Sequence, residues 1–600
     1  MCGIIAYSGE RQASPILLEG LKQLEYRGYD SAGMLTIDSN SEFELKKDVG
    51  KVLEINQKVN FLDLEGMMGI AHTRWATHGG VTRANAHPHV SNNGRIGVIH
   101  NGIVENYKEL KAKLVSEGFT FYSETDTEIV PNLVEYWMRV RGLDFLHAVL
   151  NTFRSLEGNF ALVVIDKDSK MIIGAKNGSP LVLGVGKNKE EFFLASDIPA
   201  FLEHTKDVVY LYDGDTVIVF PPTTQSKRHY EILDYRTGTL VERPVQSVSW
   251  DIEHAAKGEF DHFMLKEISE QVETIQKASS QDREVIEDIT QRIRKAKGVF
   301  LIGCGSSYHA CLSASYLFSK LASFHINTVL ASEFSAYENF LKEETLVIAV
   351  TQSGETIDVL DAIKTAKQKG CKIISIVNVM GSSATQFADA SLFLNVGPEV
   401  SVLSTKTYTA QLAVLSLLAY SLAGKYDEGE RELKYLWNVV YNLTAATMRN
   451  RIKELADKLS TSNHIFVLGR GALFATALEA ALKIKEVSYI HAEAFAGGEL
   501  KHGPISLIGK GTPCIVFVSK DTENNILSNA MEVKSRGGYL IGVGPTPIDT
   551  FDFFIKVPES DELNPICQII PIQILAYQLA VILGHDPDRP RNLAKSVTVR

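Results

Sequence analysis

Cysteine and long apolar runs are both scarce in this sequence. The 600 residues contain six cysteines, with no Cys-x-x-Cys pair or other metal-ligand spacing. Such sparse use is typical of a reducing compartment, so we expect neither disulfides nor a zinc site. The two longest apolar runs, around residues 410–423 and 569–583, carry Gln, Ser or Pro and fall short of a membrane span.

Basic stretches are also missing, although the chain is rich in charge. The net charge of −11 is spread along the sequence, which argues against nucleic acid or a membrane as the main partner. No signal peptide precedes Cys2, so we expect a cytoplasmic protein. A composition that is 45% apolar and 22% charged is typical of folded domains, and the length predicts three or four of them at about 150 residues each.

The first seven residues, Met1-Cys2-Gly3-Ile4-Ile5-Ala6-Tyr7, place a cysteine next to the initiator methionine. If Met1 is removed, the terminal α-amino group, with a pKa near 8, can take the proton of a thiol whose pKa is about 8.5. One residue would then supply both nucleophile and base. The alternative is an ordinary start in which Cys2 is a small core residue.

Residues 1–240 contain many short apolar runs and few helical ones. This pattern predicts stacked sheets, with helices at about 16–24, 107–117 and 127–139 to cover their faces. Polar residues gather where the predicted strands end, which is where binding sites tend to lie.

Four of these polar positions suit the binding of an amino acid. Arg74 has the planar fork that fits a carboxylate, and Asp126 can pair with an α-ammonium. Asn101 and the Gly102 amide can donate hydrogen bonds to an oxyanion. Each residue alone also fits a solvated loop position, so the pattern depends on their combination.

Five motifs together resemble the class II glutamine amidotransferases: Cys2-Gly3-Ile4, 26–31 (YRGYDS), 72–79 (HTRWATHG), His100-Asn101-Gly102 and Glu124-Thr125-Asp126. The resemblance implies a four-layered α/β/β/α sandwich of the N-terminal nucleophile type, in which Cys2 attacks the glutamine amide and ammonia is released. It implies that Asn101 and Gly102 hold the oxyanion. The glutamine-binding residues that it implies are Arg74, Trp75, Thr77, His78 and Asp126.

A repeat follows a weakly periodic linker at residues 241–287. The strand and Gly-x-Gly turn at 299–305 match those at 465–471. Strands alternating with helices predict two doubly wound parallel sheets, over residues 288–425 and 426–590, before a tail at 591–600. The first turn lacks the third glycine of a dinucleotide fingerprint, so no such cofactor is expected.

Hydroxyl-rich turns mark the first repeat, at 351–356 (TQSGET), at Ser306-Ser307 and at 404–407 (STKT). Hydroxyls and amides at a helix N-terminus can cradle a phosphate, although helix capping also favours Ser and Thr there.

In the second repeat, Glu479, Lys483 and Glu486 share one helix face. This spacing suits either acid–base chemistry or a surface ladder of ion pairs. In the tail, Lys595 is a candidate for carbonyl chemistry.

These features resemble tandem sugar isomerase domains. With the amidotransferase half, the resemblance implies an aminotransferase that passes ammonia from glutamine to fructose 6-phosphate and isomerises it to glucosamine 6-phosphate. It implies that Lys595 forms an imine with the sugar, that Glu486 moves a proton, and that His502 from the neighbouring subunit of a homodimer assists ring opening. This acid–base scheme requires no metal or organic cofactor. The implied sugar-phosphate residues are Ser306, Ser307, Gln352, Ser353, Thr356, Val402, Ser404 and Lys483.

Two other functions are weighed against this one. Another class II amidotransferase would need a pyrophosphate or adenylate loop, and none is visible. A non-catalytic sugar-phosphate sensor would not explain a nucleophile at position 2 with its full set of partners.

The second repeat is expected to have lost the phosphate cradle. Aligning 347–356 with 514–523 sets Lys520, Asp521 and Glu523 against the hydroxyl-rich turn. Carboxylates beside a helix N-terminus repel a phosphate, so we predict one sugar phosphate per chain.

Overall fold

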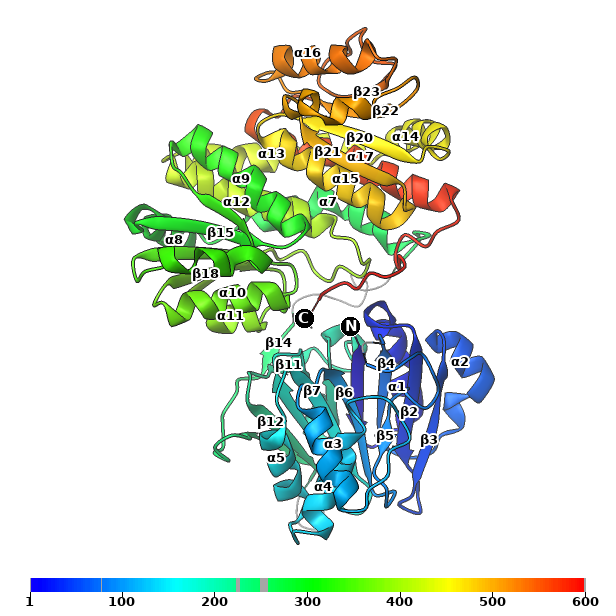
Figure 1. Cartoon of the computed structure of the whole chain (residues 1–600). Helices are drawn as coiled ribbons and strands as arrows, with labels where there is room; N and C mark the ends of the chain where they lie inside the picture. Colours follow the sequence, from blue (N-terminus) through cyan, green and yellow to red (C-terminus); the bar gives the residue numbers. More distant parts are fainter. Residues whose placement is uncertain (1, 77, 223–226, 249–256, 598–600) are drawn as a thin grey trace. The chain divides into compact units, whose positions relative to one another are not determined.

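The chain forms two compact units in this computed structural model, which describes residues 2–76, 78–222, 227–248 and 257–597 (Figure 1). The first unit comprises residues 1–255, 381–386 and 594–600, and the second comprises 256–380 and 387–593. Each unit has its own sheets and its own apolar core, so each is described separately.

Two antiparallel sheets make up the described part of the first unit. The eight-stranded sheet has the order β14 (Gln246–Ser247), β11 (Asp207–Tyr210), β9 (Val182–Val185), β10 (Phe192–Ala195), β1 (Gly3–Ser8), β4 (Met68–Arg74), β2 (Ser31–Ile37) and β3 (Phe43–Val49). The six-stranded sheet has the order β13 (His229–Asp234), β12 (Asp215–Phe220), β8 (Met171–Asn177), β7 (Phe160–Asp166), β6 (Ile96–Gly102) and β5 (His89–Val90).

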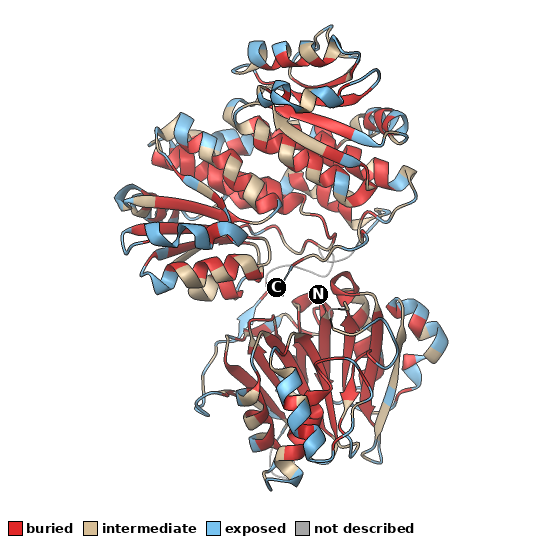
Figure 2. Cartoon of the chain, viewed as in Figure 1, coloured by how far each residue is buried: buried red, intermediate tan, exposed pale blue. Residues whose placement is uncertain are grey.

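Alternating side chains of β1 show how these sheets are layered. Ile4 and Ala6 belong to the apolar core between the sheets, whereas Ile5 and Tyr7 pack in the outer core with a helix. This period of two is expected for a strand that is buried on both faces. The layers confirm the predicted α/β/β/α sandwich, and Figure 2 shows that most of its strands are buried, whereas the edge strand β3 is partly exposed. The helices are α1 (Ala13–Leu24), α2 (Val52–Val59), α3 (Tyr107–Ser116), α4 (Ile129–Arg139) and α5 (Phe145–Ser155).

Two parallel sheets with the same strand order confirm the repeat in the second unit. The first runs β16 (Asn327–Leu330), β15 (Gly298–Gly303), β17 (Thr345–Val350), β18 (Lys372–Val377) and β19 (Ala390–Phe393). The second runs β21 (His491–Ala496), β20 (His464–Gly469), β22 (Pro513–Phe517), β23 (Tyr539–Gly544) and β24 (Phe553–Lys556). In each sheet the strand that comes first in the chain, β15 or β20, lies between the second and the third. The strand order therefore reverses between β15 and β17 in one sheet and between β20 and β22 in the other.

The helices of the two repeats share one continuous apolar core. Helix α9 of the first repeat packs against α15 of the second. This contact brings the two repeats together along these two helices. The helices are α7 (Phe263–Ser279), α8 (Arg283–Lys295), α9 (Ser306–Ala322), α10 (Ile357–Gln368), α12 (Lys406–Leu422), α13 (Tyr426–Thr444), α14 (Ala446–Leu459), α15 (Ala472–Ser488), α16 (Glu523–Lys534) and α17 (Asn564–Ile582), and the short α11 is Ser383–Phe387.

The apolar run near the C-terminus forms a longer helical segment than the sequence suggested. Residues Asp561–Ile582 are long and apolar enough to cross a membrane by length and composition. However, 83% of the 18-residue apolar stretch of this segment is buried inside the fold. Residues of α17 belong to the shared core. This segment therefore fits the core helix of a folded domain.

Candidate active sites

Strand pairing places Cys2 beside the loop that follows β4. Gly3 is paired with Thr73, and a Cβ on Gly3 would lie only 2.6 Å from the Thr73 hydroxyl, so the strands pack closely here. The Cys2 Sγ accepts a hydrogen bond from the Trp75 amide at 3.2 Å. Burial raises the pKa of the Cys2 thiol, while the charge of Arg74 acts in the opposite direction. A thiol in this position needs a base to become a nucleophile.

Asn101 and Gly102 lie at the end of β6, next to Cys2. Asn101 Nδ2 donates to the Cys2 carbonyl at 2.9 Å and to Ser196 Oγ at 2.8 Å. Gly102 has φ +129°, and a Cβ there would lie 2.0 Å from the Asn159 carbonyl, so this position requires glycine. Sequence reasoning missed Ser196, which also accepts from the Ile4 amide at 2.7 Å and thereby holds the nucleophile strand.

Four buried histidines lie next to this site, and one of them contacts Asn101. His72, His87, His89 and His100 all have pKa values lowered by burial, to about 3 for His72, so the rings are neutral. His72 Nε2 lies 3.1 Å from Asn101 Oδ1, which fixes the amide with its nitrogen toward Cys2. Among the described residues, no group of His, Cys, Asp or Glu side chains is arranged to hold a metal ion.

The predicted glutamine residues surround the same loop. Arg74 is buried and donates to the carbonyls of His78, Gly79 and the next glycine, at 2.5, 3.0 and 3.1 Å. Asp126 accepts from the Val104 amide at 2.7 Å. The Trp75 ring packs edge-on against Tyr29, and Thr77 lies outside the described residues.

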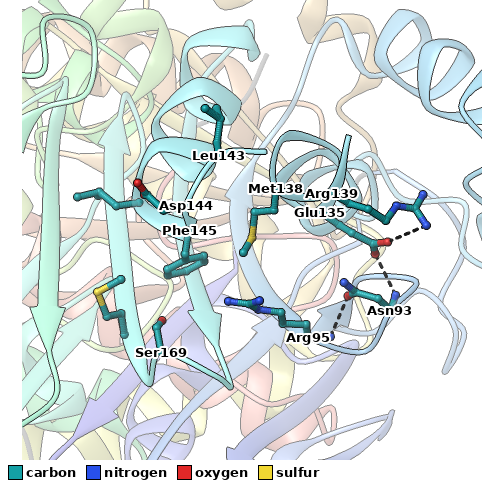
Figure 3. Close-up of a pocket in the computed structure, with 11 residues that line it drawn as sticks. Asn93, Arg95, Glu135, Met138, Arg139, Leu143, Asp144, Phe145 and Ser169 are labelled. Atoms are coloured by element: carbon teal, nitrogen blue, oxygen red, sulfur yellow. Dashed lines mark hydrogen bonds and ion pairs between the residues drawn. The ribbon is translucent and has the colours of Figure 1, made fainter. Parts of the chain in front are cut away.

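A separate hollow of 590 Å³ in the first unit contains none of the predicted site residues (Figure 3). Its charged side chains are paired within the domain, as with Glu135, which accepts from the Asn93 amide, and Arg95, which binds Asp166 through two nitrogens. The hollow therefore does not belong to the site around Cys2.

In the second unit, the hydroxyl-rich turns lie at the switch point of the first parallel sheet. The turns after β15 and β17 meet where the strand order reverses, which is the usual ligand crevice of such folds. Ser306 and Ser307 begin α9, and Thr356 is the residue before α10. The Thr356 side chain makes no capping hydrogen bond, so capping does not account for this hydroxyl.

The two serines at the start of α9 present different hydrogen-bonding groups. Ser307 Oγ accepts from Gln411 Nε2 at 3.0 Å and keeps its own hydrogen for a ligand oxygen. Ser306 Oγ donates to Glu479 at 2.8 Å and accepts from Lys483 at 3.1 Å. Ser307 is thus suited to donate to a phosphate, whereas the hydrogen of Ser306 is already used.

The third turn is held by a buried carboxylate that the sequence did not reveal. Glu399 accepts from the amides of Thr405 and Thr407 and from the Thr407 hydroxyl, at 2.9, 3.1 and 2.7 Å. Ser404 Oγ lies 2.5 Å from Thr407 Oγ1, and the Val402 amide donates to the Asp588 carbonyl. These contacts fix the loop that carries Val402 and Ser404.

The three residues of the predicted row on α15 lie close together, with Lys483 in contact with Ser306; Glu479 and Lys483 are buried, and Glu486 is half-buried. Lys483 Nζ lies 3.4 Å from Glu479 and 2.7 Å from Glu486, with the Lys483 and Glu479 side chains 1% and 0% exposed. This burial argues against a surface ladder of ion pairs. The charges of both carboxylates outweigh the burial that lowers the pKa of Lys483, so its pKa is raised and it stays charged.

Two other predicted site residues lie further along the chain. His502 is exposed at the end of a 3-10 turn, Glu499–His502. Lys595 belongs to the segment 594–600, which groups with the first unit, and its role at the sugar site stays a prediction.

The switch point of the second repeat is lined by charged side chains of both signs. A cavity of 240 Å³ there is lined by Arg470, Gly471 and Ser519 and by several carboxylates. Lys320 of α9 reaches into it and pairs with Asp521 at 3.2 Å and Glu562 at 3.1 Å. An ammonium of the chain itself therefore lies where the first repeat would hold a phosphate.

We expect titration calorimetry with fructose 6-phosphate to saturate near one ligand per chain. Replacing both Ser353 and Thr356 with Ala should abolish the binding, since the hydroxyls of the first cradle are lost. Ser535→Ala is the matched control, because it removes an exposed hydroxyl that follows α16 and lies in neither turn, so it should change neither affinity nor stoichiometry. Two ligands per chain, or tight binding by the double variant, would show that the second repeat still binds phosphate.

Comparison with known proteins relates both units to characterised families. A family model of the glutamine amidotransferase domain matches residues 72–203, and a model of the SIS domain matches 292–421 and 458–583. The chain is 44% identical to the glutamine–fructose-6-phosphate aminotransferase (isomerizing) of Pyrococcus horikoshii and 43% identical to that of Thermococcus kodakarensis, each over the full length of both chains.

A solved structure resembles the second half of the chain. The C-terminal domain of glucosamine-fructose-6-phosphate aminotransferase from Francisella tularensis aligns with a TM-score of 0.52 and 31% identity. It covers 56% of this chain and 100% of that domain.

Proposed function

Since this chain belongs to the family of isomerizing glutamine–fructose-6-phosphate aminotransferases, we propose that it transfers the amide nitrogen of glutamine to fructose 6-phosphate and forms glucosamine 6-phosphate. The observation that carries the proposal is the full-length match of relatives with this name. Both required sets of residues are present on one chain, one around Cys2 and one around Lys483. A sensor of sugar phosphates would need only the second set.

The first unit releases ammonia from glutamine. Cys2 Sγ attacks the side-chain amide carbon, and the α-amino group of Cys2, once Met1 is removed, takes the thiol proton and gives it to the leaving ammonia. Asn101, by giving up one of its two hydrogen bonds, and the Gly102 amide stabilise the oxyanion, and water then hydrolyses the thioester to glutamate. The raised pKa of the buried thiol supports the need for this adjacent base. Arg74, Trp75, Thr77, His78 and Asp126 bind the glutamine.

Residues of the second unit, together with Lys595 of the C-terminal tail, bind and isomerise the sugar. The hydroxyls of Ser307, Ser353 and Thr356 hold the phosphate, and Gln352, Val402 and Ser404 complete the cradle. Lys595 forms an imine with C2 of the open-chain sugar and expels water, and ammonia then displaces the lysine. Glu486 takes a proton from C1 and returns one to C2, which converts the ketose imine to the aldose amine. Lys483 holds Glu486 in place.

The assembly and the location of the protein are part of the proposal. His502 is exposed, so it is available to the sugar site of a second copy, and we propose a homodimer. The scarce cysteines and the buried apolar helix α17 support a cytoplasmic location.

Lys595→Ala tests the division of labour between the units. We expect it to abolish amino-sugar formation while a basal glutaminase activity survives, because the imine forms on the acceptor side only. Product is measured by mass spectrometry and glutamate by an enzyme-coupled assay. Arg591→Ala in the same tail is the control for disturbance of the segment. Undiminished synthesis by the Lys595 variant would remove the covalent role.

A further inference from the structure

His309 lies one turn after Ser306 on α9 and contacts Glu479 at Oε2, whereas Lys483 lies nearest to Oε1. Its Nδ1 atom is 2.7 Å from Glu479 Oε2, and the His309 side chain is 14% exposed. The contact crosses from the first repeat to the second, at positions far apart in the sequence. His309 has no part in the scheme described above.

The direction of this hydrogen bond follows from the charge of Glu479. Although burial raises the pKa of Glu479, the charge of Lys483 and the hydrogen bonds from His309 and Ser306 outweigh it, so the pKa is lowered. Glu479 is therefore a carboxylate, which can only accept hydrogen bonds. His309 Nδ1 donates to one oxygen, and Ser306 donates to the other at 2.8 Å.

Lys483 is shared between two carboxylates inside the protein. It lies 3.4 Å from Glu479 Oε1 and 2.7 Å from Glu486 Oε2. Charges interact strongly at such distances when water is excluded. The attraction between Glu479 and Lys483 depends on the hydrogen bonds that Glu479 accepts from its other donors. Loss of the His309 hydrogen bond would therefore draw Lys483 toward Glu479 and away from Glu486.

We propose that His309 is a positioning residue for the proton transfer: by donating to Glu479, it sets how Lys483 divides its charge between Glu479 and Glu486. It contacts no reacting atom itself. Through this chain it holds Glu486 in its orientation and sets its strength as a base. The inference rests on the proposed function, since Glu486 is the proton-transfer residue there.

The test compares two substitutions of His309. His309→Ala removes the donor, whereas His309→Asn retains one, because the asparagine Nδ2 atom lies at about the same distance from Cα as the histidine Nδ1. We expect the alanine variant to lower kcat about tenfold or more with KM for fructose 6-phosphate changed less than about threefold, as is typical when a catalytic group is misaligned. The asparagine variant should keep at least about half of kcat.

A double-mutant cycle with Glu479→Gln shows whether His309 acts through Glu479. In that background His309→Ala should change kcat less than about twofold, because the linking carboxylate is already lost. The exposed His325, which follows α9, provides the control variant His325→Ala with unchanged kcat. Calorimetric binding of fructose 6-phosphate confirms that each variant is folded.

The outcomes separate this inference from the proposed function. If the unaltered protein forms no glucosamine 6-phosphate, the function itself is wrong. If it is active but His309→Ala retains full kcat, or His309→Asn is as impaired as His309→Ala, the positioning role is overturned. Full additivity in the cycle would place the action of His309 elsewhere than on Glu479.

Discussion

Cys2→Ala is expected to abolish glutamine-dependent synthesis of glucosamine 6-phosphate and to leave synthesis from concentrated ammonium salts. The thiol is the only group in the scheme that bonds to glutamine, so its loss should lower glutaminase turnover at least about a thousandfold. The residues proposed to bind the sugar all lie in the second unit, apart from Lys595, and none is expected to depend on the thiol. Product formation is measured by mass spectrometry with each nitrogen source in turn.

Cys371→Ala is a suitable control for this variant. Cys371 is a buried cysteine of the second unit, and it has no place in the proposed chemistry. Its replacement should leave glutamine-dependent turnover within about twofold of the starting value. If a folded Cys2→Ala protein loses synthesis from ammonium as well, nitrogen release and sugar chemistry are not separable as proposed.

Glu486→Gln is expected to lower amino-sugar formation by about 10²- to 10⁴-fold, because glutamine keeps the shape of the side chain but cannot take a proton. Glutaminase activity and fructose 6-phosphate binding should stay within about twofold, since neither uses the Glu486 carboxylate. The change is measured as kcat with ammonium as nitrogen source, which bypasses the first unit.

The exposed Glu454 on α14 offers the matched control, and Glu454→Gln should have no effect on kcat. Retained turnover in a folded Glu486→Gln protein would show that another group moves the proton. Glu479 would then be the first residue to test, because it shares Lys483 with Glu486.

Local sequence patterns were sufficient to predict the architecture. The two matching Gly-x-Gly turns end β15 and β20, as the repeat required, and the four- and three-residue spacing on α15 brings Glu479, Lys483 and Glu486 to one face. These predictions succeeded because helix and strand periods are set by residues close in the chain. Strand β3 (Phe43–Val49) was missed because it is a charged, half-exposed edge strand.

Contacts between distant segments could not be predicted. Ser196 on Asn101, Glu399 under the third turn and His309 on Glu479 each depend on packing between elements, which leaves no periodic signal in the sequence. Each of these residues supports one that the motifs identified. The sequence thus indicated the groups that are proposed to contact the substrate, whereas the structure was needed to find the residues that hold them in place.

Isotope transfer tests the central claim most directly. The protein is incubated with fructose 6-phosphate and glutamine labelled with ¹⁵N in the side-chain amide, and the products are analysed by mass spectrometry. The account predicts glucosamine 6-phosphate that carries the ¹⁵N label, together with unlabelled glutamate. Glutamate without any labelled amino sugar, from a protein that binds fructose 6-phosphate, would contradict it.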